Sequence, residues 1–503
     1  MDLMTASMSE IAGAVKAQKI SAHEVAQFFK GRIESLNPKL NAYITLDPST
    51  LEQAKKIDAQ IARGEDPGLL AGVPWGIKDM FCTKGLKTTA ASKILENFIP
   101  PYDATVVESL KSQGAIILGK LNQDEFAMGS SNETSFFGPA KNPWNTELVP
   151  GGSSGGSAAA QAARLCAAST GTDTGGSIRQ PASFCGIVGV KPTYGRVSRY
   201  GIIAYASSLD QAGPMTNSVA DAALALQVIS GPDPRDGTTA QIPVPHFARD
   251  LNTNIKGLKI GILKESSSDA GLHPDVQKTL HEAMETLRQM GAEIVEVSVP
   301  LTKVSVAAYY LVAASEASSN LSRYDGVKYG YRAHFASLGS TKLEDFYSKT
   351  RSEGFGKEVQ RRIMLGTYCL SAGYYDAFYN KAGQVRRLLR DEFLAAFQKC
   401  DVILGAVTTH PAFPIGERIS DPLAMYLNDV FTVASNLAGL PGMSVPFGFS
   451  KDEGRGKLPI GVQLTAAHFQ EQKMLNVGAA LESAGRVPTF IKDVMEAAHV
   501  SRI

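Results

Sequence analysis

The chain has 503 residues, of which 44% are hydrophobic and 20% charged, and its formal net charge is +1. This composition allows a large buried core and excludes an intrinsically disordered chain. Because positive and negative charges balance, no global field attracts the protein to nucleic acid or to a membrane surface.

We expect a cytoplasmic protein without a metal site. The five cysteines are scattered and never form a CxxC pair, which argues against disulfides and zinc. The N-terminal residues lack the basic and apolar regions of a secretory signal, and no apolar run has the length of a membrane span.

Helical periodicity predicts an N-terminal helical region over residues 5–64, in which Ser21 and Glu24 form the capping box of one helix. The segment 73–81 (VPWGIKDMF) is typical of a short buried strand and contains Lys78. A lysine in such a place is most often a surface residue whose ammonium reaches solvent. The alternative is a desolvated amine with a lowered pKa, which can act as a base.

Residues 104–120 predict a helix followed by a strand. Gly114 and Lys120 have the spacing of a phosphate-binding loop, but Leu121 stands where a magnesium-binding Ser or Thr is needed. The residues between Gly114 and Lys120 are also typical of a strand, so we do not expect nucleotide binding here.

Two Gly/Ser clusters, 151–157 and 175–177, enclose an Ala-rich run that predicts one short helix and one buried strand. Ordered glycines are costly because each loses more backbone entropy on folding than other residues. Flexible linkers are the alternative. The apolar flanks favour instead a backbone that is held close to a ligand, with hydroxyl groups presented to it.

Later segments predict an α/β fold. Residues 258–297 have the order strand, helix, strand of a crossover unit, and residues 302–400 are mostly helical. We therefore expect a mixed, largely parallel, twisted central sheet with helices on both faces. The chain would form one domain over residues 1–503, with a catalytic core at 65–230 and a helical insert at 302–400 that covers it.

The first Gly/Ser cluster also matches the pattern GxSxG, centred on Ser153 or on Ser154. A Ser-His-Asp hydrolase would place that serine between a strand and a helix, whereas this cluster follows a proline-containing loop. A serine activated by a buried neutral lysine, Lys78, fits better, with a second hydroxyl to relay the proton. The backbone N–H groups from Thr174 to Gly176 could then stabilise a tetrahedral oxyanion.

The block GGSSGGSAAA (151–160), the run TDTGGSIRQP that contains Ser177, and GIKD upstream together resemble the amidase signature family. The resemblance covers essentially the whole chain. It implies a Ser–cis-Ser–Lys triad on an α/β core. In this sequence Ser177 would be the acylated nucleophile, Lys78 the base, and Ser153 the bridging serine after a cis peptide bond. Thr174, Gly175 and Gly176 would form the oxyanion hole.

Further segments resemble one subfamily, the A subunits of tRNA-dependent glutamine amidotransferases; they are 122–131, 322–330, 351–368, 371–379, 425–432 and 436–446. This resemblance implies hydrolysis of glutamine within a heterotrimer that also holds subunits B and C. The ammonia would pass to a partner subunit, which amidates Glu-tRNA(Gln) or Asp-tRNA(Asn) with ATP. We expect no cofactor in this chain, because ATP and Mg²⁺ would belong to the partner.

Free glutamine carries a carboxylate and an ammonium, so a selective site needs a cation and an anion. By position in the motifs, Arg362 would bind the carboxylate and Asp429 the ammonium, with Tyr310 as a further contact. Without the resemblance, Arg362 would be a surface arginine and Asp429 a cap. The loop 405–411 departs from the family pattern, which leaves its geometry open.

Two other functions remain open at this stage. One is a stand-alone amidase that acts on another small amide. The other is a structural subunit without catalysis, which the presence of Lys78, Ser153 and Ser177 disfavours.

Overall fold

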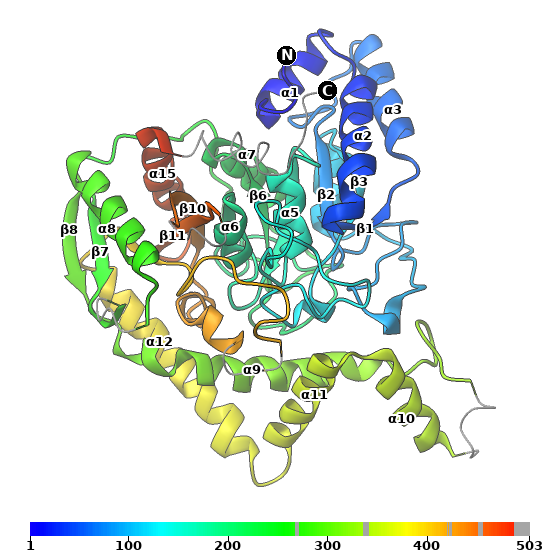
Figure 1. Ribbon diagram of the computed structural model, residues 1–503, viewed down its shortest axis with the longest axis vertical. Helices are drawn as coiled ribbons and strands as arrows, with labels where there is room; N and C mark the ends of the chain where they lie inside the picture. Colours follow the sequence, from blue (N-terminus) through cyan, green and yellow to red (C-terminus); the bar gives the residue numbers. More distant parts are fainter. Residues whose placement is uncertain (267–270, 335–341, 420, 422–424, 451–455, 487–503) are drawn as a thin grey trace.

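The computed structural model describes residues 1–266, 271–334, 342–419, 421, 425–450 and 456–486 (Figure 1). Their eleven strands form one sheet with the order β1-β3-β2-β4-β6-β5-β10-β11-β9-β7-β8. The strands are β1 (Tyr43–Leu46), β2 (Pro74–Lys78), β3 (Ile116–Leu121), β4 (Ala168–Asp173), β5 (Val188–Lys191), β6 (Gln211–Thr216), β7 (Lys259–Leu263), β8 (Glu293–Val297), β9 (Val402–Ala406), β10 (Gly442–Phe449) and β11 (Pro459–Ala466).

The mixed α/β sheet is confirmed, but it is less parallel than expected. Four described pairings are parallel (β2–β3, β2–β4, β7–β8 and β7–β9) and six are antiparallel. A parallel connection needs a long crossover, whereas antiparallel neighbours do not. The neighbours β5 and β6 follow each other without an intervening α-helix among the described residues, and they pair antiparallel.

The described α-helices are α1 (Met8–Lys16), α2 (Ala22–Leu40), α3 (Thr50–Ala62), α4 (Thr105–Ser112), α5 (Gly155–Ala162), α6 (Arg179–Cys185), α7 (Val219–Ile229), α8 (Pro274–Gln289), α9 (Ser305–Asn320), α10 (Leu343–Gly354), α11 (Lys357–Leu370), α12 (Lys381–Ala396), α14 (Val433–Leu437) and α15 (Glu471–Leu481). The capping box at Ser21 and Glu24 is present at the start of α2. None of these helices is both long and apolar enough to cross a membrane.

Helices cover both faces of the sheet, as expected. In β10, a Cβ on Gly478 of α15 would collide with Met443, whereas Ser444 lies with Ser183 of α6 around Gly461. Because consecutive strand residues point to opposite faces, α15 and α6 lie on opposite sides of the sheet (Figure 1). Every residue of β10 except the last is buried, as a strand covered on both faces requires.

Two expected regions are largely as predicted. The unit β7–α8–β8 is a parallel crossover. The described part of 302–400 is helical, and positions 335–341 lie outside the described residues. The helical region 5–64 also contains a strand, β1, which the sequence analysis missed. It lies at the sheet edge beside β3.

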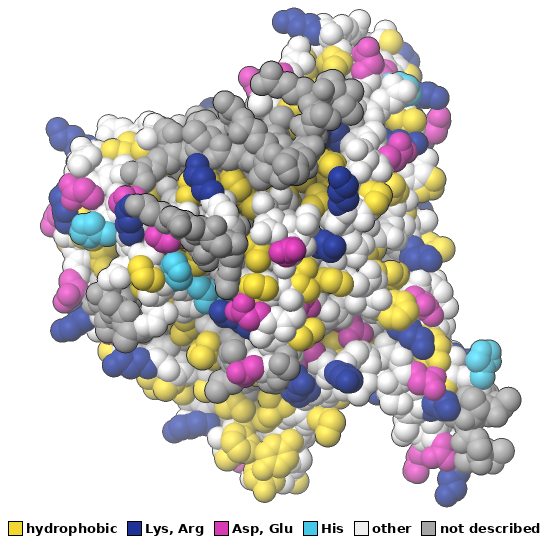
Figure 2. All heavy atoms as spheres, viewed as in Figure 1, with side chains coloured by type: hydrophobic (Ala, Val, Ile, Leu, Met, Phe, Trp, Pro, Cys, Tyr) yellow, Lys and Arg dark blue, Asp and Glu magenta, His cyan; other side chains and the backbone are white. Residues whose placement is uncertain are grey.

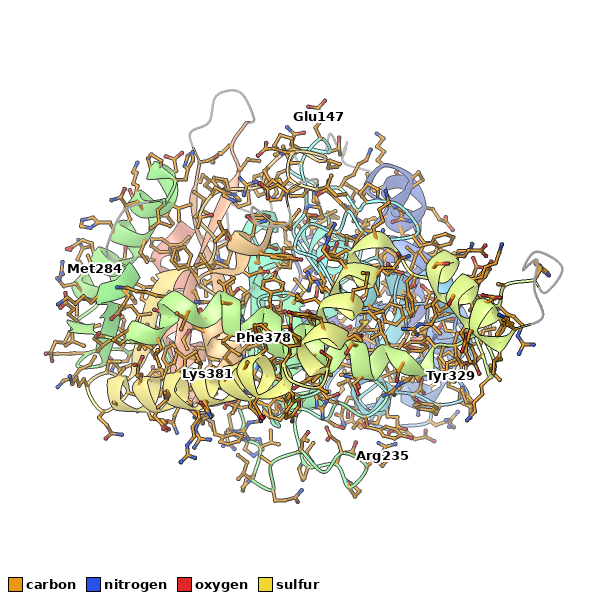
Figure 3. All side chains as sticks on the ribbon, turned by 90° about the horizontal axis from the view of Figure 1, so that it is seen from below. Glu147, Arg235, Met284, Tyr329, Phe378 and Lys381 are labelled. Atoms are coloured by element: carbon orange, nitrogen blue, oxygen red, sulfur yellow. The ribbon has the colours of Figure 1, made fainter. Side chains whose placement is uncertain are left out.

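The helices α9, α11 and α12 pack on one another below the sheet, and α14 joins them to the core (Figure 1). Figure 2 shows hydrophobic side chains gathered at the lower tip of this layer, where Tyr368, Tyr374 and Tyr375 are exposed. Figure 3 shows the layer from below, with Phe378 and Lys381 at the start of α12.

Candidate active site

Lys78 is the last residue of β2, with β3 and β4 on either side, and it is fully buried. Its Nζ lies 2.8 Å from each of three hydroxyl oxygens, on Ser153, Ser154 and Thr172. Among the described residues no carboxylate forms an ion pair with it. Burial lowers the pKa of Lys78 to about 7, against the attraction of Asp124 and more distant carboxylates. The amine can therefore be neutral at neutral pH and accept a hydroxyl proton.

Ser153 lies directly before α5, and the peptide bond between Gly152 and Ser153 is cis. Ser153 is fully buried. A Cβ on Gly152 would come within 2.0 Å of Asp124 Oδ2, so only glycine fits at this position. The first Gly/Ser cluster thus brings a hydroxyl onto the amine of Lys78, and it is not a flexible linker.

Ser177 follows β4, in the short loop between β4 and α6. It is 9% exposed, whereas Ser153 is fully buried. The Ser177 carbonyl accepts a hydrogen bond from the Ser154 N–H at 3.2 Å, which joins the two Gly/Ser clusters. In the described part of the chain, the Ser177 hydroxyl makes no hydrogen bond. The structure therefore brings Lys78 and Ser153 together and leaves Ser177 beside them with its hydroxyl open to a substrate.

The expected oxyanion donors fit only in part. The Gly176 N–H donates to Asp173 Oδ1 at 2.8 Å, so this donor is already engaged. Gly175 and Gly176 nevertheless allow close packing, since a Cβ would lie 2.5 Å from the Tyr309 ring or 2.3 Å from Thr432 Oγ1, respectively. Gly176 also has φ +142°, a conformation that favours glycine.

Sequence reasoning missed the buried ion pair that holds this loop. Arg179 donates to Asp173 through Nε (2.9 Å) and Nη2 (3.0 Å), and both side chains are fully buried. Although burial opposes ionisation, Arg179 lowers the pKa of Asp173. Further contacts of Arg179 reach Ser435 and Gln463 at 2.7 Å. The signal that could have found this pair is the presence of two charges in an otherwise small and apolar run.

Arg362 is not a surface arginine, because it is only 3% exposed. It lies on α11, where its Nε donates to Glu358 at 2.8 Å and its Nη1 to the Tyr205 hydroxyl at 2.7 Å. The rings of Tyr205, Tyr310 and Tyr426 surround its guanidinium at 5.7, 5.2 and 5.5 Å. Tyr310 therefore supports Arg362 from one side, stacked on Tyr426 at 3.9 Å. Tyr205 was not foreseen.

Asp429 is 7% exposed, and its Oδ2 accepts a hydrogen bond from Ser130 Oγ at 2.7 Å. Burial raises the pKa of Asp429 to about 7. No ion pair involves it within the described residues. The loop 405–411 extends to this region, since His410 Nε2 lies 3.0 Å from Asn428 Oδ1.

A cavity of about 220 Å³ opens beside these groups, which suits a small molecule. Its lining includes Ser130, the hydroxyl partner of Asp429, together with Arg362 and Tyr426. The cavity therefore has a cation on its wall and an anion one hydrogen bond behind it.

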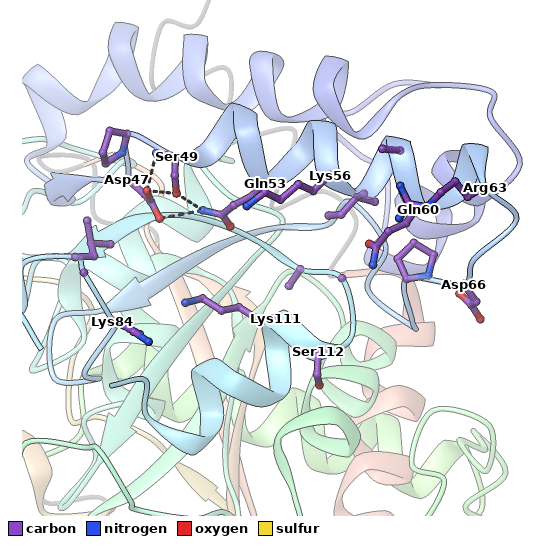
Figure 4. Close-up of a pocket in the computed structure, with 18 residues that line it drawn as sticks. Asp47, Ser49, Gln53, Lys56, Gln60, Arg63, Asp66, Lys84, Lys111 and Ser112 are labelled. Carbon is purple, nitrogen blue, oxygen red and sulfur yellow. Dashed lines mark hydrogen bonds between the residues drawn. The ribbon is translucent and has the colours of Figure 1, made fainter. Parts of the chain in front are cut away.

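The largest cavity, about 850 Å³, lies elsewhere (Figure 4). It is an open groove along α3 and the end of α4, with Lys56, Lys84 and Lys111 on its walls, and it contains none of the expected site residues. Lys120 of the suspected phosphate-binding loop is fully buried and contacts the Phe81 carbonyl. As expected, the segment is a strand. No group of three or more potential metal ligands occurs in the described part of the chain.

The amidase family model matches residues 24–475. The chain is 70% identical to the A subunit of the Glutamyl-tRNA(Gln) amidotransferase of Bdellovibrio bacteriovorus, over 97% of this chain and 98% of that protein. It is 40% identical to the crystal structure of the protein of the same name from Thermotoga maritima, with a TM-score of 0.78 and coverage of 96% and 95%. A peptide amidase from Stenotrophomonas maltophilia is 30% identical, with a TM-score of 0.79 and coverage of 96% and 97%. The chain therefore belongs to the amidase family of enzymes.

Proposed function

We propose that this chain is the glutaminase subunit of a tRNA-dependent amidotransferase. The observation that carries the proposal is the full-length identity of 70% to a relative with that subunit name. The buried cation and anion at the cavity support it, because they match the two charges of free glutamine. An uncharged pocket would suit an apolar amide better.

In the proposed reaction, neutral Lys78 takes the Ser153 proton as Ser153 takes the proton of Ser177. Ser177 Oγ attacks the side-chain amide carbon of glutamine, and the C=O π electrons move onto oxygen. Backbone N–H groups of the loop at Thr174–Ser177 stabilise this oxyanion. As the C–N bond breaks, the proton returns through Ser153 to the leaving nitrogen, which departs as ammonia. Water then attacks the Ser177 ester by the same relay and releases glutamate.

Arg362 would bind the α-carboxylate of glutamine and ionised Asp429 its α-ammonium, with Tyr310 holding the guanidinium in place. This assignment explains why both charged side chains are buried at one cavity without pairing with each other. Each would gain its full opposite charge only when the amino acid enters.

We further propose a cytoplasmic heterotrimer in which subunits B and C accompany this chain. The partner subunit would convert Glu-tRNA(Gln), Asp-tRNA(Asn) or both into the amidated tRNA with ATP and the ammonia made here. The ATP and Mg²⁺ sites belong to that partner, and this chain carries no cofactor.

The test uses the complex that copurifies with this chain. With Ser177→Ala, glutamine-dependent formation of Gln-tRNA stops, whereas ammonium chloride still supports it. Wild-type glutamine hydrolysis rises when Glu-tRNA and ATP are added. A stand-alone amidase, the second candidate, would show no stimulation, and it would act on simple amides as fast as on glutamine.

A further inference from the structure

A buried carboxylate lies directly beside the loop that carries Ser177. Asp210 precedes β6, and β6 runs antiparallel to β4 with Gln211 opposite Asp173. One further step along this ladder places Asp210 next to Thr174. Thr174 Oγ1 donates to Asp210 Oδ1 at 2.7 Å, and Asp210 is only 4% exposed.

The same carboxylate also holds a turn of the chain. Asp210 Oδ2 accepts from the Tyr205 N–H at 2.9 Å, and Oδ1 accepts from the Ala206 N–H at 3.0 Å. The turn is closed by the Ala206 carbonyl, which accepts from the N–H groups of Leu209 and Asp210 at 2.9 Å. The backbone of Tyr205 is therefore fixed to the carboxylate that fixes Thr174.

Tyr205 carries the connection on to Arg362. It is fully buried, and its hydroxyl is the acceptor of Arg362 Nη1. A second link runs through Tyr309, which hydrogen-bonds Tyr205 and lies against Gly175. The loop before Ser177 and the proposed carboxylate-binding arginine are thus parts of one hydrogen-bonded unit.

We infer that Asp210 is a positioning residue that holds the Ser177 loop and Arg362 at one fixed separation. The inference rests on the proposed function, since it takes Arg362 to bind one end of the substrate while Ser177 attacks the other. A rigid spacing between these two points selects amides of glutamine length. Small errors in that spacing are costly, because attack requires near-contact geometry.

A carboxylate is the side chain this position requires. Donors from Thr174, Tyr205 and Ala206 all converge on it, and a carboxylate consists only of acceptors. In Asp210→Asn one oxygen becomes an NH₂ group that faces a donor, so one connection is lost while size and shape are kept.

The experiment compares three variants in glutamine hydrolysis by the complex. Thr174→Val breaks only the connection to the Ser177 loop, and we expect kcat to fall about tenfold with little change in KM. Tyr205→Phe breaks only the connection to Arg362, and we expect KM to rise about tenfold with kcat nearly unchanged. Asp210→Asn shows both effects, and adding Thr174→Val to it lowers kcat no further.

A second measurement separates this inference from the proposed function. Phenylmethanesulfonyl fluoride carries no amino-acid groups, so its rate of reaction with Ser177 reports the loop alone. We expect Asp210→Asn and Thr174→Val to slow this labelling about tenfold, and Tyr205→Phe to leave it unchanged. If wild type is labelled but does not hydrolyse glutamine, the proposed function fails, and the labelling rates still decide the role of Asp210.

Asp210→Asn that labels and turns over within twofold of wild type would overturn the inference. Thermal unfolding shows whether that variant folds. If it does not, Thr174→Val and Tyr205→Phe decide the matter, because a uniform loss of kcat and KM in both would mark a merely structural role.

Discussion

Lys78 and Lys120 lie on neighbouring parallel strands, and both are fully buried. Ile77, not Lys78, pairs with Lys120, so the two lysines point to opposite faces of the sheet. Burial lowers the pKa of Lys78 to about 7 and that of Lys120 to about 8. Two amines in one fold are thus desolvated to a similar degree.

Their partners differ in kind. Lys78 meets only hydroxyl groups, which can both give and accept a proton. Lys120 meets the Phe81 carbonyl, which can only accept, and the carboxylate of Asp79 lies 3.9 Å away. Burial lowers the pKa of both amines, but only a hydroxyl partner lets a neutral amine act as a base. Lys120 is a structural lysine by the same argument.

The largest expected effect is on the base. Lys78→Met should lower glutamine hydrolysis about 10⁴-fold, the order of loss seen when a member of a catalytic triad is removed. Lys120→Met should leave the rate within a few fold, measured below its unfolding temperature. Steady-state ammonia release checks both, and equal losses in the two variants would remove the distinction.

The reverse holds for stability. Lys120→Met leaves Asp79 buried without its cation, so we expect the free energy of unfolding to fall by about 3–5 kcal/mol. Chemical denaturation measures it, and Asp79→Asn in the same chain should recover part of the loss. A Lys120→Met protein as stable as wild type would show that the Asp79 contact is unimportant.

The hydroxyl partners of Lys78 can be separated. Ser153→Ala removes the proposed relay and should lower kcat about 100-fold. Ser154 lies at the same distance from Nζ, but it is not in the proposed relay, so Ser154→Ala should cost less than tenfold. If the two losses are reversed, Ser154 is the bridging serine.

The smallest expected effect is on pH dependence. Because the neutral amine is the active form and its pKa is about 7, kcat should fall about tenfold per pH unit below pH 7 and level off above it. Asp429 ionises near the same pH, so kcat at saturating glutamine is the quantity to follow. Lys120→Met should keep this limb unchanged, and a flat wild-type profile from pH 5.5 to 8 would contradict the assignment of Lys78.

Local patterns predicted much of this molecule. The buried strand with Lys78, the short helix and strand between the Gly/Ser clusters, and the crossover β7–α8–β8 all follow from periodicity and turn residues. Strand β10 was missed because Pro446 lies within it, where the register shifts beside β11. A proline in a central strand argues against that assignment from sequence alone.

The site was predictable only where its residues are close in sequence or carried by a motif. Tyr205 is bound to Arg362 across 157 positions, and Arg179 contacts residues more than 250 positions away. No local pattern announces such contacts. The reason for the glycines was also hidden, since the collision at Gly152 is with Asp124, and only the fold brings these segments together.

The order of strands has a consequence for synthesis. One half of the sheet, up to β5, comes from residues 43–216, and the other half comes from 259–466. A chain emerging from the ribosome therefore completes its nucleophile and base long before Arg362 and Asp429 exist. Until β10 emerges, roughly 250 residues after β5, the edge of β5 has no partner strand. A nascent chain arrested in that interval would be a hydrolase without a chosen substrate, and its open edge could pair with another chain.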